Sequence, residues 1–127
     1  MMLRYTALAV ALLLAACAAP QPAPSGLADL MERPAERALF EGIRAYDDGN
    51  YAVAETALRK ALAGGLQTGR DQATAHKLLA FITCTSDRVP ACEDAFRAAR
   101  AADPAFALSR SETGHPLWGP VYKRTLP

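Results

Sequence analysis

No apolar run in this chain of 127 residues is long enough to cross a bilayer, which takes about 20 consecutive apolar residues. Residues 5–14 form a shorter apolar segment, and Arg4 stands directly before it. A positive charge followed by a short apolar segment is typical of an export signal. We therefore expect the first residues to direct export of the chain rather than to form a helix of the fold.

The chain also lacks an excess of charge of either sign. Its fourteen Lys and Arg residues are balanced by thirteen Asp and Glu residues, for a formal net charge of +1. Without a basic cluster the chain has no electrostatic footprint for nucleic acid, and attachment to a membrane has to come from something other than charge. A nucleic-acid partner is therefore not expected.

Histidine and the common catalytic motifs are scarce as well. His76 and His115 are the two histidines, and neither has a carboxylate or a cysteine at the spacing of metal ligands. The chain has no Gly-x-Ser-x-Gly elbow, no phosphate-binding glycine loop and no dinucleotide fingerprint. We expect no metal site, no cofactor, no small-molecule substrate and no enzymatic activity.

What the chain does have is a cysteine after small residues, in Leu14-Ala15-Ala16-Cys17. This stretch resembles the lipobox of bacterial lipoproteins. The resemblance implies that residues 1–16 are a signal peptide and that Cys17 becomes the acylated first residue, anchored to the membrane by its acyl chains. Alanine rather than aspartate at position 18 implies sorting to the periplasmic face of the outer membrane. An ordinary secretory peptide with a coincidental cysteine is the alternative.

Residues 18–26 are rich in proline and alanine. Such a composition cannot build a core and is typical of an extended linker, so we expect residues 17–33 to tether the lipidated end to the rest of the chain. About a hundred residues then remain, which suits one small domain.

Residues 34–104 show the apolar spacing of helices, with apolar residues three or four positions apart. Pro34 suits the first turn of a helix, Asp48-Gly49-Asn50 suits a turn, and Asp103-Pro104 suits a helix end. Stripes of small residues would let neighbouring helices pack closely as antiparallel hairpins, which predicts an all-α fold. The helices are expected at 35–47, 51–63, about 71–85 and about 89–102.

The two expected hairpins are related in sequence. Aligning Gly42 with Ala80 brings residues of the same size class into register. The matching pairs are Ala54 with Cys92, Leu58 with Phe96, and Ala61 with Ala99. This pattern resembles the tetratricopeptide repeat, with two copies in residues 34–104. Four amphipathic helices of no repeat family are the alternative.

Beyond Cys17 the chain has one pair of cysteines, Cys84 and Cys92, at the end of the third expected helix and near the start of the fourth. An even pair in an exported protein favours a disulfide over a nucleophile or a metal site. The short turn between the two helices would fold one cysteine back beside the other. A nucleophile formed by a cysteine with a histidine is the alternative.

Residues 105–127 depart from the repeat pattern and hold the only tryptophan, Trp118. Together with Leu117 and Tyr122 it brings a large apolar area, which we expect to cap the exposed last helix of the stack. Binding of a partner by this tail is the alternative. Ser109 and Glu112 have the spacing of a capping box, which predicts a short helix before the tryptophan.

The lipobox, the helical hairpins, the cysteine pair and the tail around Trp118 together resemble the TssQ family of type VI secretion-associated lipoproteins. The cysteine pair combined with residues 114–122 is the more specific part of this likeness. The resemblance implies an accessory, non-catalytic role as a protein-interaction scaffold, with protein partners in the envelope. A general envelope-assembly lipoprotein, acting in outer-membrane protein or pilus assembly, is the alternative.

In tetratricopeptide repeats the first helix of each copy lines a concave surface. The matching stripe here is formed by Leu39, Ile43, Tyr46, Lys77 and Phe81. Because a stripe of small residues on helix 35–47 already faces its own hairpin, this stripe of larger residues needs a separate cover. We expect a helical partner segment to lie there, and the chain's own tail is the alternative.

Overall fold

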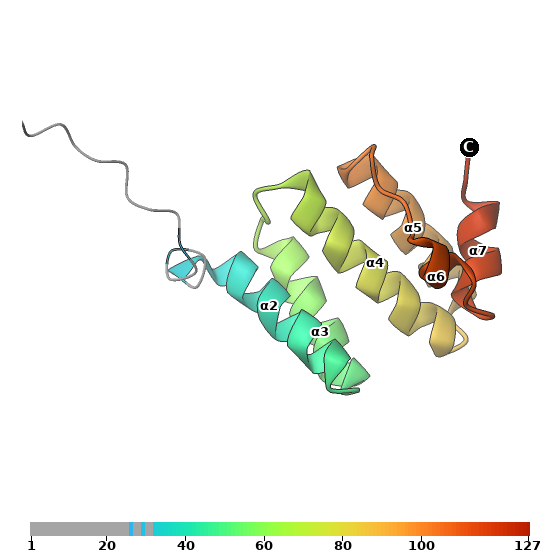
Figure 1. The fold of residues 1–127 in the computed structure, drawn as a ribbon. Coiled ribbons are helices and arrows are strands. Elements are labelled where there is room, and N and C mark those ends of the chain that lie inside the picture. Colours follow the sequence, from blue (N-terminus) through green and yellow to red (C-terminus); the bar gives the residue numbers. More distant parts are fainter. Residues whose placement is uncertain (1–25, 27–28, 30–31) are drawn as a thin grey trace, which may run out of the picture.

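The structure, a computed structural model, describes residues 26, 29 and 32–127 (Figure 1). Cys17, the expected signal peptide and most of the expected tether lie outside these residues. The described residues form six helices and no strand, which confirms the predicted all-α fold. Within this part of the chain, no helix has both the length and the apolar character that a bilayer crossing requires.

Helices α2 (Pro34–Asp47) and α3 (Tyr51–Ala63) form the first antiparallel hairpin, as predicted. α2 begins at a proline, whose missing N–H costs no hydrogen bond in the first turn. In the turn, Gly49 has a φ of 76°, a left-handed conformation that glycine adopts without strain. The side-chain oxygen of Asn50 then accepts a hydrogen bond from the backbone N–H of Val53 at 3.4 Å. Local signals therefore set the ends of both helices.

Small residues bring α2 and α3 close together. A Cβ added to Gly42 would lie 2.8 Å from the side chain of Leu58, so glycine leaves the room that this contact needs. On α3 the facing residues are completely buried: Ala54, Leu58 and Ala61. The predicted stripe of small residues is therefore the contact surface of the hairpin.

Helices α4 (Gly69–Thr85) and α5 (Val89–Ala102) form the second hairpin. α4 begins at Gly69 rather than near Asp71, because the side chain of Thr68 accepts a hydrogen bond from the N–H of Asp71 at 3.0 Å and caps the helix there. The residues aligned with the stripe of the first hairpin are buried as well: Ala80, Cys92, Phe96 and Ala99. The two hairpins thus repeat one packing pattern.

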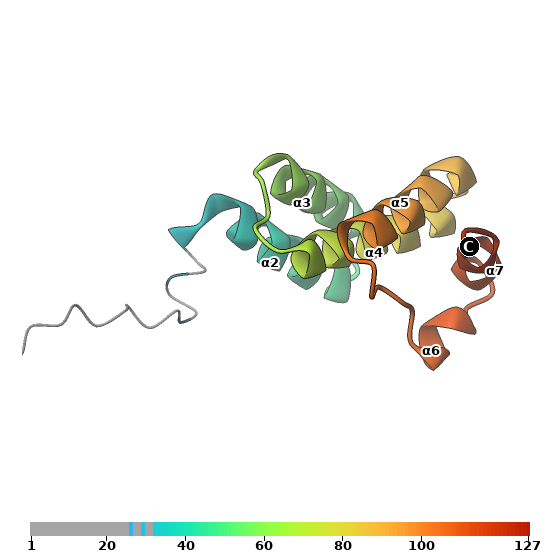
Figure 2. The ribbon, with the colours of Figure 1, turned by 90° about the horizontal axis from the view of Figure 1, so that it is seen from above.

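The hairpins stack in chain order, and α4 packs against both α2 and α3 (Figure 1). Seen from above, α3 and α5 lie on one side of the stack and α2 and α4 lie on the other (Figure 2). The chain that follows α5 runs on the side of α2 and α4. The described part of the tail therefore leaves the side formed by α3 and α5 uncovered.

Two short helices complete the described chain, α6 (Arg110–Thr113) and α7 (Trp118–Arg124). The predicted capping box is present at the start of α6: the side chain of Ser109 accepts from the N–H of Glu112, and the Glu112 carboxylate accepts from the N–H of Ser109.

Helix α7 was not predicted, because Gly119 and Pro120 usually interrupt a helix. Both residues fit here. Pro120 lies in the first turn of α7, where its missing N–H is not needed. A Cβ on Gly119 would clash with the carbonyl oxygen of Thr113, so glycine lets α7 approach the end of α6.

Candidate functional site

The stripe predicted to be an open partner groove is closed in the structure. Leu39 and Phe81 are 7% and 4% exposed and belong to the hydrophobic core. Ile43 and Tyr46 are half-buried and pack against that core. The prediction of an open groove along α2 and α4 is therefore wrong. The physical reason is that α2 packs against α4, and a segment from the end of the chain packs against α4 as well.

That covering segment is the tail. The indole of Trp118 stacks on the ring of Phe81, with ring centroids 4.0 Å apart. The indole N–H donates to the backbone carbonyl of Glu112 at 2.8 Å. Lys77 on α4 donates to the Glu112 carboxylate at 2.8 Å, and its ammonium lies 5.7 Å from the centre of the Phe81 ring. Lys77 thus contacts the tail.

Electrostatics at this contact favour the closed arrangement. Burial by itself would raise the pKa of the Glu112 carboxyl, but the bonds from Lys77 and from the backbone of Ser109 outweigh it and hold the pKa below its usual range. Glu112 is therefore ionised near neutral pH, as the ion pair with Lys77 requires.

Neither face of the Trp118 ring is free to stack on a ligand. Phe81 covers one face, and the imidazole of His115 lies parallel to the indole with ring centroids 3.3 Å apart. Leu117 does not have the capping role expected of it, since 51% of the residue is exposed. Trp118 and Tyr122 contribute the apolar area that the tail buries.

The second half of the tail packs against α5 at the end of the stack (Figure 1). The ring of Tyr122 meets the edge of Phe96 at a centroid distance of 5.3 Å, and its hydroxyl accepts from the N–H of Leu108 at 3.3 Å. Arg100 on α5 donates to the carbonyl of Thr125 at 2.6 Å. Trp118 and Tyr122 thus attach the tail to both helices of the second hairpin.

Cys84 and Cys92 are joined by a disulfide, with their Cα atoms 5.2 Å apart. Both residues are buried, at 4% and 0% exposure. The bond ties the last turn of α4 to the first turn of α5 and leaves neither thiol available as a nucleophile. Within residues 26, 29 and 32–127, no group of three His, Cys, Asp or Glu side chains is placed to hold a metal ion.

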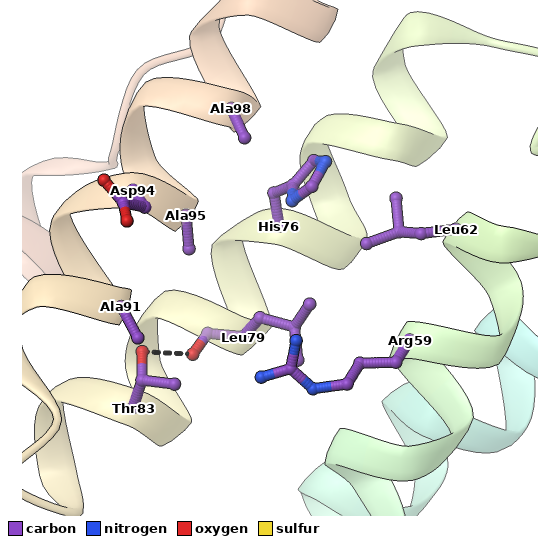
Figure 3. A pocket seen from close by; sticks show the side chains of 9 residues that line it. All are labelled: Arg59, Leu62, His76, Leu79, Thr83, Ala91, Asp94, Ala95 and Ala98. Carbon is purple, nitrogen blue, oxygen red and sulfur yellow. Dashed lines mark hydrogen bonds between the residues drawn. The ribbon is translucent and has the colours of Figure 1, made fainter.

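An open groove lies on the other side of the stack (Figure 3). Helix α4 forms its floor, and α3 and α5 form its two walls. Its volume is about 310 Å³. We call it the α3–α5 groove. It is lined by Arg59 and Leu62 from α3, His76, Leu79 and Thr83 from α4, and Ala91, Asp94, Ala95 and Ala98 from α5.

The inside of the α3–α5 groove is mostly apolar. Leu62 and Leu79 project from the wall and the floor, and the α5 wall consists largely of alanines. The hydroxyl of Thr83 donates to the carbonyl of Leu79 at 2.7 Å, so this polar group of the floor is satisfied within α4 (Figure 3). The pKa of His76 is lowered because the ring is half-buried, and its imidazole is neutral near pH 7.

The rims of the α3–α5 groove carry opposite charges. Glu55 on α3 accepts two bonds from Arg88, both at 2.8 Å, and two from Arg59, at 2.7 and 3.2 Å. These bonds, that from Arg88 first, lower the pKa of Glu55 to about 2. Arg59 on α3 and Arg88 at the start of α5 share this one carboxylate, which leaves a surplus positive charge where the start of α5 meets α3. On α5, the Asp94 side chain is 80% exposed, and its contact with Arg97 is 3.5 Å long.

Sequence reasoning missed the α3–α5 groove, although a signal was present. Ala91, Ala95 and Ala98 recur at the spacing that places residues on one helix face. This face lies beside the buried stripe that contains Cys92 and Phe96, and the sequence did predict that stripe. Alanine is common on any helix, so its spacing alone does not show that two neighbouring helices leave a hollow over it.

Comparison of the chain with protein-family models, with curated proteins and with solved structures found no match.

Proposed function

We propose that this chain is a lipid-anchored, non-catalytic scaffold on the periplasmic face of the outer membrane, and that it is an accessory component of a type VI secretion system. The observation that carries the scaffold role is the α3–α5 groove, an apolar hollow with oppositely charged rims on the side of the stack that the described tail leaves uncovered. A site of this kind suits recognition of a protein segment, because shape, apolar area and charge all contribute to selectivity.

The placement in the envelope has two supports. The lipobox ending at Cys17 supports lipid anchoring, and the disulfide between Cys84 and Cys92 fits an oxidising compartment such as the periplasm. The secretion machine as the place of action is supported by the resemblance of the lipobox, the hairpins, the cysteine pair and the tail to the TssQ family.

A secretion assay in the source bacterium tests this function. The gene is deleted, and release of the tube protein of the contractile machine into the medium is measured. We expect release to fall severalfold and to return when the unchanged gene is supplied. The variant Cys17→Ser should not restore release, because a scaffold that lacks its acyl chains is no longer held at the membrane.

Two readouts make the result specific. Export of an unrelated periplasmic enzyme should stay normal in the deletion strain. Unchanged release of the tube protein would contradict a role in this machine. If the deletion instead lowers the amounts of outer-membrane barrel proteins or of pili, the general envelope-assembly role replaces the proposed one.

A further inference from the structure

The α3–α5 groove restricts the backbone conformation of a segment that binds in it. Five of its nine lining residues are apolar, namely Leu62, Leu79 and the three alanines of α5, and the hydroxyl of Thr83 is already bonded within α4. Few lining groups are therefore left to pair with a peptide backbone. An extended segment would bury unpaired N–H and C=O groups there, at a cost for each group. An α-helix satisfies its own backbone groups and avoids this cost. The lining therefore favours a helix as the occupant.

The size of the α5 side chains sets how near that helix can come. Ala91 and Ala98 are half-buried and Ala95 is 9% exposed, so a helix can lie close to the α5 backbone. The α5 wall of the groove runs from Ala91 to Ala98, so it can contact about two turns of the occupant. Leu62, which is half-buried, then offers a larger surface for apolar side chains of the occupant, whereas Leu79 is only 4% exposed and closes the floor beneath it.

The charges on the rims define the edges of the occupant. Arg59 is 57% exposed and shares Glu55 with Arg88, so its rim attracts a carboxylate. Asp94 on the opposite rim attracts a cation, since its one intramolecular ion pair is long and exposed. Opposite charges on two parallel rims suit a helix with acidic residues along one edge and basic residues along the other.

We propose that the α3–α5 groove binds an amphipathic α-helix of a partner protein, with a narrow apolar face, Asp or Glu on the edge beside Arg59, and Lys or Arg on the edge beside Asp94. This inference rests on the proposed scaffold function and names the kind of segment that the scaffold recognises.

A peptide-display selection against the full lipidated chain in detergent tests the proposal. The probes are helical peptides of about 14 residues with a fixed Leu and Ala face and with acidic, basic and neutral residues randomised on both edges. We expect the selected peptides to carry acidic residues on one edge and basic residues on the other. Their affinities are then measured by fluorescence anisotropy against variants of the chain.

Three variants separate groove binding from other surfaces. Arg59→Glu changes an exposed side chain, and we expect it to weaken binding about tenfold and to be rescued by peptides whose acidic edge is replaced by lysine. Ala98→Trp fills the groove and should weaken binding at least as much. Val53→Glu is the matched control, because Val53 is exposed on α3 outside the groove lining and should leave affinity unchanged.

The proposal is overturned if no peptide is enriched, if enriched peptides lack the two charged edges, or if Arg59→Glu and Ala98→Trp leave affinity unchanged. A dimer in sedimentation that Ala98→Trp dissociates would also overturn it, since the occupant would be a second copy of this chain. The secretion assay above is independent. Normal tube-protein release together with groove-specific peptide binding would refute the secretion role alone. Reduced tube-protein release without groove-specific peptide binding would refute helix binding in the α3–α5 groove alone.

Discussion

The indole ring of Trp118 lies on the ring of Phe81, with centroids 4.0 Å apart and an angle of 16° between the planes. Phe81 also meets Tyr46 of α2 at 6.5 Å and Phe96 of α5 at 6.3 Å. The pair is therefore the point at which α2, α4, α5 and α7 come together. A tail that makes such a contact is part of the core of this small domain.

Replacement of Trp118 by alanine tests that conclusion. We expect Trp118→Ala to lower the free energy of unfolding by about 3 kcal/mol, because it uncovers Phe81 and leaves a cavity beside it. Urea denaturation followed by circular dichroism measures the loss. Leu117→Ala is the matched control, since Leu117 is half-exposed, and its effect should stay within about 0.5 kcal/mol. Equal effects of the two variants would place the tail outside the cooperative core.

The disulfide between Cys84 and Cys92 is expected to stabilise the second hairpin. Closing so short a loop corresponds to about 2.5 kcal/mol by loop-closure entropy, so the double variant Cys84→Ala, Cys92→Ala should melt several degrees lower than the unchanged protein. A reductant should lower the melting temperature of the unchanged protein to a similar value and leave the double variant unaffected. Quantitative thiol labelling of both cysteines in denatured protein that was isolated without reductant would contradict the bond.

Gly69 tests how closely the second hairpin is packed. A Cβ at this position would clash with the carbonyl oxygen of Ala102 at the end of α5, and backbone has to move to make room. We expect Gly69→Ala to destabilise the protein by about 1 to 3 kcal/mol in urea denaturation. Gly114→Ala is the control, because the nearest atom to an added Cβ there lies 3.6 Å away. Its stability should be unchanged or slightly increased, since alanine reduces the freedom of the unfolded chain.

Helix ends could be predicted from the sequence where a local signal sets them. Pro34 begins α2 and Asn50 caps α3. Each of these helix starts depends only on residues within one turn of it. The same holds for the repeated stripes, because Leu58 and Phe96 follow helical spacing and are buried where expected. The start of α4 lies two residues before the predicted position near Asp71, because the side chain of Thr68 caps the helix there.

What could not be predicted depends on contacts between residues far apart in the chain. The spacing of Phe81 shows that one face of α4 is apolar, but it does not show that Trp118 covers that face. A partner helix and the chain's own tail would leave the same pattern in the sequence. The α3–α5 groove could not be predicted for a related reason. Its volume depends on how far apart α3 and α5 lie across α4.

The carboxylate of Glu55 links α3 to the start of α5 and should make stability depend on pH in acid. Its pKa is lowered to about 2 in the folded protein by bonds from Arg88 and Arg59, against 4.5 as the ordinary value. Between these two values the unfolded chain binds more protons than the folded chain, so stability falls as pH drops from about 4.5 towards 2. Above that window the contribution is fully present.

Replacement of Glu55 by glutamine removes this contribution. We expect Glu55→Gln to cost about 1 kcal/mol at pH 7, a modest figure because both arginines are about half-exposed and solvent screens the pairs. The difference from the unchanged protein should shrink as pH falls towards 2, and salt should reduce it. Glu41→Gln, an exposed position for which the described residues show no ion pair, serves as the control. A cost for Glu55→Gln that stays constant from pH 7 to pH 2 would show that this carboxylate acts through packing rather than through charge.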